Sequence, residues 1–125
     1  MQIKDLEIFN QMPFSFWIKD ETGKYVWCNR AVSQLAKGEV IGKTDRELIW
    51  ADNADEFQAD DKQVFETGKP IYRHEHMDES SQGKVTHSVC KWLGELDGKK
   101  QCFGIAFFIE KGEETKPEQV RGQSR

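Results

Sequence analysis

Residues 16–29, which read FWIKDETGKYVWCN, restrict the fold more than any other part of the chain. Two aromatic-rich apolar runs flank a polar segment in which Gly23 can turn the chain, and this is the pattern of a β-hairpin. The pattern predicts strands at residues 14–19 and 25–28. Asn29 follows directly and is well placed to cap a helix, because its side chain can accept backbone N–H groups that lack a partner. The fold therefore begins with a hairpin that leads straight into a helix.

Three helices are predicted between this hairpin and the strands that end the fold. The first, RAVSQLA, follows the capping asparagine and can end at Gly38. Thr44 and Glu47 have the spacing of a capping box and predict a short second helix. The third is a longer helix over residues 53–66, which the following Gly-Lys-Pro stops.

Three further strands are predicted over residues 71–77, 84–93 and 102–109, with Asp97-Gly98 as a strong hairpin signal. The first two strands pair locally, and the last three form a meander. One antiparallel sheet with helices on one side would bury the apolar faces of all these elements, so the predicted fold class is α+β.

The two ends of the chain differ from this folded centre. Residues 1–12 carry apolar side chains three positions apart and predict a short amphipathic flanking helix. Residues 111–125 have Val120 as their one apolar residue and are predicted to be a disordered tail or linker.

Composition limits the classes of function. The 125-residue chain suits one domain, and its net charge of −4 without a basic stripe argues against direct nucleic-acid binding. The sequence has neither an apolar run long enough to span a membrane nor a secretory signal, so we expect a cytoplasmic protein. Cys28, Cys90 and Cys102 form no CxxC pair and are expected to be reduced, buried thiols, with a redox or metal role as the alternative.

Four segments, in this order and at these spacings, carry a resemblance to a known family: IKDETGKYVWCNRA, IGKTDREL, DKQVFETGKP and DGKKQCFGIAFFIE. Over residues 13–110 the chain resembles the PAS domain family. The resemblance implies a five-stranded antiparallel sheet with short helices packed on one face and space for a small molecule between them. Many members end in an Asp-Ile-Thr stretch that couples the last strand to an effector, whereas this chain reads IEKGEETK.

The resemblance also assigns the two faces of the sheet. Gly104 and Ala106 should face the helices, as should Trp17 and Lys19, while the residues between them point outward. A broad apolar outer face would then need a cover, which we expect to be the N-terminal helix or a second copy of the chain. The residues expected at this interface are Leu6, Phe9, Phe16, Ile18, Phe103, Ile105 and Phe107.

A second set of residues is expected to surround a ligand. Asp61 is an odd charge on the apolar stripe of the long helix and needs hydrogen bonds or a cation, so we interpret it as a structural tie, with ligand contact as the alternative. His87 is interpreted as a ligand contact or pH-sensitive group, or else as a structural histidine. The complete predicted set is Trp17, Trp27, Phe57, Asp61, His87 and Ala106.

The resemblance also indicates which cofactors the sequence could bind. Residues 53–66 lack the histidine of haem sensors, and RAVSQLA lacks the cysteine of light sensors, which argues against haem and a covalent flavin adduct. Ala106 stands where those light sensors have a flavin-contacting glutamine. Non-covalent flavin stacked on Trp17, Trp27 or Trp92 stays open. The pair His74 and His76 is read as an exposed polar strand face rather than a metal site.

The resulting hypothesis is a bacterial sensory domain, not an enzyme. It would bind a small molecule, form a homodimer, or both. It would regulate a linked or partner effector, such as the histidine kinase of a two-component system, a diguanylate cyclase or a transcription regulator. One alternative is a ligand-free dimerisation scaffold of the same fold. Another is a small isomerase-like α+β enzyme, which the early strands and the lack of a recognisable nucleophile–base pair disfavour.

Overall fold

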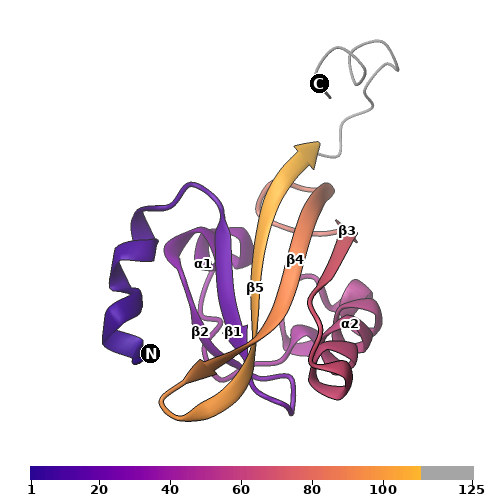
Figure 1. Cartoon of the computed structure of the whole chain (residues 1–125). Coiled ribbons are helices and arrows are strands. Elements are labelled where there is room, and N and C mark those ends of the chain that lie inside the picture. Colours follow the sequence, from indigo (N-terminus) through magenta and orange to yellow (C-terminus); the bar gives the residue numbers. More distant parts are fainter. Residues whose placement is uncertain (111–125) are drawn as a thin grey trace, which may run out of the picture.

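The fold is one five-stranded sheet, seen in a computed structural model that describes residues 1–110 (Figure 1). The strand order is β2-β1-β5-β4-β3, and every neighbouring pair is antiparallel. The first and last strands of the chain therefore lie side by side in the middle of the sheet, which confirms the predicted α+β class. The tail predicted at residues 111–125 lies outside the described residues.

The elements follow the predicted order, with one further short helix, η3, before the long helix. They are η1 (Ile3–Gln11), β1 (Ser15–Lys19), β2 (Tyr25–Cys28), α1 (Arg30–Ala36), η2 (Asp45–Glu47), η3 (Ala51–Asn53), α2 (Ala54–Thr67), β3 (Ile71–Met77), β4 (Val85–Leu96) and β5 (Lys99–Glu110). Within the described part of the chain, none of the helices has both the length and the apolar character needed to cross a membrane.

The β4–β5 hairpin is longer than predicted. Asp97 and Gly98 have φ angles of 52° and 82°, which form the tight turn that matches the twist of paired strands. Pairing therefore continues to Leu96 and Lys99, directly beside the turn. The sequence predicts a longer turn over ELDGKK, whereas backbone pairing extends through these polar residues because it does not need an apolar pattern.

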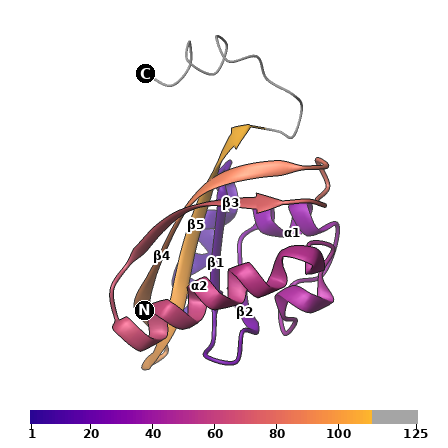
Figure 2. The same cartoon turned by 90° about the vertical axis from the view of Figure 1, so that its right-hand side faces the viewer.

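The helices α1 and α2 cover one face of the sheet, which we call the inner face (Figure 2). The opposite, outer face is covered in part by η1, which lies beside β1 and β2 (Figure 1). Leu6 of η1 is fully buried and packs with Phe16, Ile18 and Phe103. The flanking helix is of the 3-10 type, whose three-residue period matches the spacing of its apolar residues.

Asn29 joins the elements of both faces. Its Oδ1 accepts from the backbone N–H of Phe16 at 3.1 Å and of Val32 at 3.3 Å, which confirms the predicted helix cap. Its Nδ2 donates to the carbonyl oxygens of Phe9 and Phe14 at 3.0 and 2.9 Å. One buried amide therefore fixes η1, β1 and α1 relative to one another.

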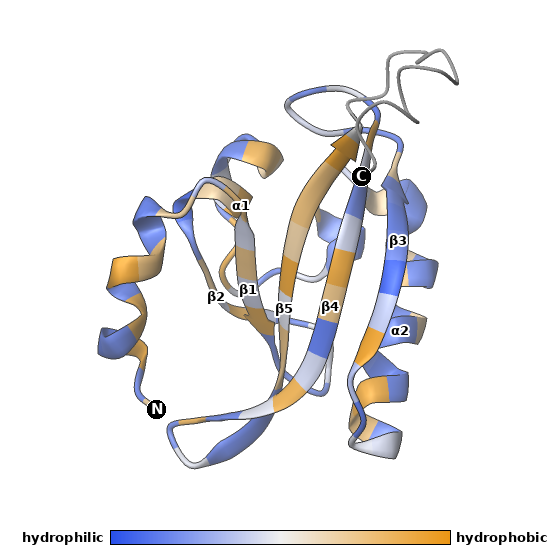
Figure 3. Ribbon diagram, turned by 45° about the horizontal axis from the view of Figure 1, so that its top comes forward, coloured by the Kyte–Doolittle hydropathy of each residue, from blue (hydrophilic) through white to orange (hydrophobic). Residues whose placement is uncertain are grey.

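The outer face remains apolar beyond the reach of η1. Figure 3 shows that β5 is apolar along most of its length. Phe107 and Ile109 of β5 are 44% and 46% exposed, and Phe107 packs on Phe14 with ring centroids 4.4 Å apart. Of the predicted interface residues, Phe107 is thus the one left uncovered, while Phe9 and Ile105 pack against the cluster beneath η1.

Candidate functional site

A cavity of about 30 Å³, the inner cavity, lies between the sheet and the helices. Its walls come from β1 to β5, α1, α2 and the segment between η2 and η3. The lining residues are Ser15, Trp17, Lys19, Tyr25, Val32, Leu35, Trp50, Phe57, Glu75, Met77, His87, Val89, Lys91 and Ala106. A cavity of this volume has room for about two water molecules.

Four of the six predicted ligand residues meet at this cavity: Trp17, Phe57, His87 and Ala106. Asp61 does not line the cavity, because its carboxylate is engaged by lysines behind the wall. Trp27 lies on the outer face, in the cluster of Phe16 and Ile18, so its placement beside a ligand was wrong. The cause is a β-bulge in the β1–β2 pairing, where Ile18 is opposite Trp27 and the next residue, Lys19, is opposite Tyr25.

Three polar atoms in the cavity wall have no hydrogen-bond partner among the described residues. They are Trp17 Nε1, Glu75 Oε2 and His87 Nε2, on side chains that are 8%, 9% and 4% exposed. Glu75 Oε2 lies 2.8 Å from Lys91 Nζ as an ion pair, but off the line of a hydrogen bond. Buried polar atoms are rarely left unpaired, so three of them in one wall suggest a polar occupant.

Packing fixes the positions of these atoms. Trp17 lies against Gly104 of β5, where a Cβ would come within 2.4 Å of the indole ring. Glu75 of β3 is directly opposite His87 of β4, which in turn is opposite Phe108 of β5. Since only glycine leaves room for the indole, the sequence of β5 sets where the Trp17 N–H lies.

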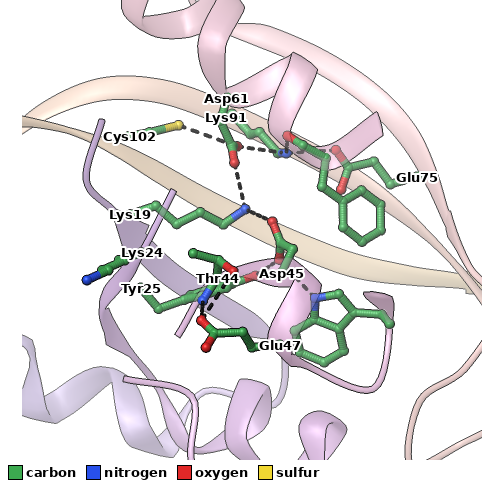
Figure 4. Close-up of polar contacts among 12 residues, drawn as sticks. Lys19, Lys24, Tyr25, Thr44, Asp45, Glu47, Asp61, Glu75, Lys91 and Cys102 are labelled. Carbon is green, nitrogen blue, oxygen red and sulfur yellow. Dashed lines mark hydrogen bonds and ion pairs between the residues drawn. The ribbon is translucent and has the colours of Figure 1, made fainter. Parts of the chain in front are cut away.

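A buried network of charges forms the floor beside the cavity (Figure 4). Lys19 Nζ donates to Asp45 Oδ2 and Asp61 Oδ2, both at 2.6 Å. Lys91 Nζ is 3.0 Å from Asp61 Oδ1 and 2.8 Å from Glu75 Oε2. Two ammonium groups thus face three carboxylates, and this provides the cation partner that the apolar position of Asp61 requires.

Further donors complete this network. Asp45 Oδ1 accepts from Tyr25 Oη at 2.7 Å and from Trp50 Nε1 at 2.9 Å. Lys91 Nζ donates to the carbonyl oxygen of Phe57 at 3.3 Å. The two lysines and Asp45 are therefore each held by at least two groups of the protein itself.

Burial and charge act against each other on the ionisable groups. Burial alone would raise the pKa of Asp61, but the ammonium groups of Lys19 and Lys91 outweigh it and lower that pKa. For Glu75 the balance is reversed, because burial raises its pKa more than Lys91 lowers it. Burial lowers the pKa of His87 to about 4, so the imidazole is neutral near pH 7 and does not fit a sensor of neutral pH.

Sequence reasoning did not identify Glu75 and Lys91 as site residues. Both lie at inward positions of strands, since Glu75 alternates with Met77 and Lys91 alternates with Val89. A charge at an apolar, inward strand position was therefore the available signal, the same signal that drew attention to Asp61 on its helix.

A second hollow of about 90 Å³ adjoins the inner cavity and shares four of its lining residues, Ser15, Leu35, His87 and Ala106. Phe108 lines this outer hollow and is 40% exposed. The rings of His87 and Phe108 stack with centroids 4.8 Å apart. This pair therefore lies between the inner cavity and the surface.

The site does not fit a flavin. Two of the three tryptophans considered for stacking, Trp27 and Trp92, belong to the outer cluster, and the inner cavity is far smaller than a flavin ring system. Among residues 1–110, no three His, Cys, Asp or Glu side chains converge as metal ligands. His76 is exposed and its Nδ1 lies 2.9 Å from Thr86 Oγ1.

Comparisons with known proteins agree with this architecture. A family model described as the PAS fold matches residues 9–110. The chain is similar to the structure "VqmA bound to DPO", with a TM-score of 0.73 and 25% identity over 85% of this chain and 57% of that one. The Vibrio cholerae VqmA dimer, described in the absence of its target DNA, has a TM-score of 0.75 and 23% identity over 93% and 55% of the two chains.

A third similar structure is the PAS domain of an HTR-like protein from Haloarcula marismortui. It has a TM-score of 0.66 and 16% identity over 84% of this chain and 89% of that one. A comparison with curated proteins finds no match. The chain spans about half the length of the VqmA chains, which therefore include a further region.

Proposed function

The chain belongs to the PAS family, and we propose that it is a sensory domain that binds a small molecule in the inner cavity and regulates an effector. PAS domains are generally sensory rather than catalytic. The observation that supports the proposal most is the convergence of Trp17, Glu75 and His87, each with a buried, unpartnered polar atom in the described structure. Shifting between two arrangements of the domain would require a ligand with different affinities for them.

The similar structures favour one kind of effector. VqmA is described as bound to DPO, in a complex with ligand and DNA, and among LuxR-type receptors. By analogy, we propose that this domain regulates transcription through a separate DNA-binding region, in the cytoplasm. A histidine kinase or a diguanylate cyclase as effector is the alternative.

A second candidate function, a ligand-free dimerisation scaffold, is supported by the small volume of the cavity. Trp50, Phe57 and Val32 are all at least 96% buried and fill most of the space between sheet and helices. A ligand larger than a few atoms would have to displace side chains, of which Met77 is the most adaptable.

Substitution at Ala106 separates the two candidates. Ala106 is 4% exposed and lines both the cavity and the hollow, so Ala106→Leu should fill the site. Thermal unfolding would be followed with a metabolite library that includes DPO. A ligand at a hundred times its Kd should add about 2.7 kcal/mol to the free energy of unfolding. We expect this gain in the unmodified protein and its loss in Ala106→Leu.

The control is Ala59→Leu, the same change at an exposed position of α2, which should keep the ligand response. If no compound stabilises the unmodified protein, the scaffold is the better description. A response that survives in Ala106→Leu would show that the ligand binds elsewhere.

The exposed part of the outer face supports a homodimer. Phe107 and Ile109 follow Ile105 at alternate positions of β5, and exposed apolar surface of this kind commonly marks an interface. Phe107→Asp should raise the dimer dissociation constant by about tenfold or more, since a buried aromatic anchor often contributes over 1.4 kcal/mol. Analytical ultracentrifugation would measure it, with Ala59→Asp, at an exposed position of α2 on the other side of the sheet, as the control. A monomer at all concentrations would contradict the dimer.

A further inference from the structure

The three unpartnered atoms restrict the chemistry of the occupant, provided that the proposed ligand site is real. An indole N–H can only donate, so Trp17 Nε1 requires an acceptor. The side chain of Glu75 is an ion-pair partner of Lys91, and an ionised carboxylate can only accept. The neutral His87 ring can do either at Nε2, depending on its tautomer. The wall thus requires one acceptor and one donor at two defined places.

The charges around the cavity disfavour an anion. The network holds three carboxylates and two ammonium groups, and Glu75 is the carboxylate that lines the cavity with an oxygen that accepts no hydrogen bond. Lys91 lies within ion-pair distance of Asp61 and Glu75 and donates to the carbonyl oxygen of Phe57, while Lys19 is held by two carboxylates at 2.6 Å. The network thus has one more carboxylate than ammonium groups, and both ammonium groups are already paired with carboxylates, so an anionic ligand beside the oxygen of Glu75 would add to uncompensated buried negative charge.

The shape of the cavity adds a further restriction. The indole of Trp17, the ring of Phe57 and the indole of Trp50 are all part of its lining. Such walls suit a planar group, since aromatic faces pack well against flat surfaces. The volume of about 30 Å³ limits that group to a few atoms unless the outer hollow is also used.

We infer that Glu75 makes the site selective for a small, planar, uncharged molecule that donates a hydrogen bond to its carboxylate and accepts one from the indole N–H of Trp17. Amides, and rings that carry an amino or hydroxyl group beside an acceptor atom, have this pattern. Carboxylates of the same shape are rejected. Glu75 is in this sense a specificity-determining residue, and it contacts the ligand rather than acting through another group.

Acetamide and acetate provide a matched pair of probes, since both are planar and of equal size but differ in charge and in the N–H donor. The intact chain would be labelled with ¹⁵N and titrated with each, and the indole N–H signal of Trp17, assigned from Trp17→Phe, would be followed by NMR. We expect acetamide to shift this signal and acetate to bind about tenfold more weakly or worse, since a hydrogen bond to a charged group is worth at least that factor.

Glu75→Gln tests the residue itself. It keeps the shape of the side chain and leaves two ammonium groups facing two carboxylates, so we expect the variant to fold. The preference for acetamide over acetate should fall from about tenfold to about threefold or less. Glu79→Gln, at an exposed position beyond β3, is the control and should keep the full preference.

The outcomes separate this inference from the proposed function. If acetate binds as well as acetamide, or if Glu75→Gln leaves the preference unchanged, the selectivity is wrong while the ligand site stands. If neither probe shifts the Trp17 signal, the inference is also wrong. The ligand site itself is rejected only when, in addition, no library compound stabilises the unmodified protein. A Glu75→Gln variant that does not fold leaves the acetamide-to-acetate comparison on the unmodified chain to decide.

Discussion

Lys19→Met is expected to lower the free energy of unfolding by about 3–5 kcal/mol. Lys19 is 1% exposed and is the cation that Asp45 and Asp61 share, with both contacts at 2.6 Å. Methionine would keep most of the packing volume but leave these carboxylates without their common partner. Asp45 would retain no cation at all within the network, only the donors of Tyr25 and Trp50. Urea unfolding followed by tryptophan fluorescence would measure the loss.

Lys24→Met is the matched control, because Lys24 is exposed on the same hairpin. A surface change of this kind should alter the stability by about 0.5 kcal/mol or less. Equal losses in the two variants would mean that the buried network does not stabilise the fold as described. A loss much larger in Lys19→Met supports the network even if that variant unfolds completely.

Phe16→Ala should also cost about 3–5 kcal/mol, through a different mechanism. Phe16 is 7% exposed and is the centre of the outer cluster. Its ring lies 5.1 Å from that of Phe9 and 5.4 Å from that of Trp27, both edge to face. Alanine would leave a cavity between η1 and the sheet, so η1 should also lose protection from amide hydrogen exchange.

Tyr72→Ala is the control for this change, since Tyr72 is an aromatic residue of the same sheet that is 71% exposed. We expect it to cost about 1 kcal/mol or less. Unfolding should be measured at low protein concentration, so that dimer formation does not add to the result. If η1 keeps its protection in Phe16→Ala, the outer cluster does not hold this helix.

The architecture follows from local patterns in the sequence. Alternation along a strand placed Phe16 and Ile18 on one face and Trp17 on the other, and the structure agrees. Tyr25 and Trp27 do not follow this alternation, because the bulge between them shifts the register by one residue, so that Tyr25 faces inward and Trp27 outward. A bulge depends on how two strands pair, so the apolar–polar pattern of one strand does not predict it.

The buried charge network was less accessible to such reasoning. Its members come from β1, η2, α2, β3 and β4, and they meet only when the sheet and helices pack together. Asp61 could be recognised as a charge in need of a partner, but neither its distance to Lys19 nor that to Lys91 has a counterpart in sequence spacing. The sequence therefore indicated that Asp61 needs a partner but did not identify the two lysines as that partner.

The position of β5 has a mechanical consequence for a sensor. Gly104 and Ala106 lie on its inner side, where Ala106 lines the cavity, while Phe103, Ile105 and Phe107 face outward. Under the proposed function, the ligand and the partner molecule would thus touch opposite sides of one polypeptide backbone. A displacement of that backbone by a fraction of an ångström would change the contacts on both faces together. The signal would then pass from ligand to partner across a single strand.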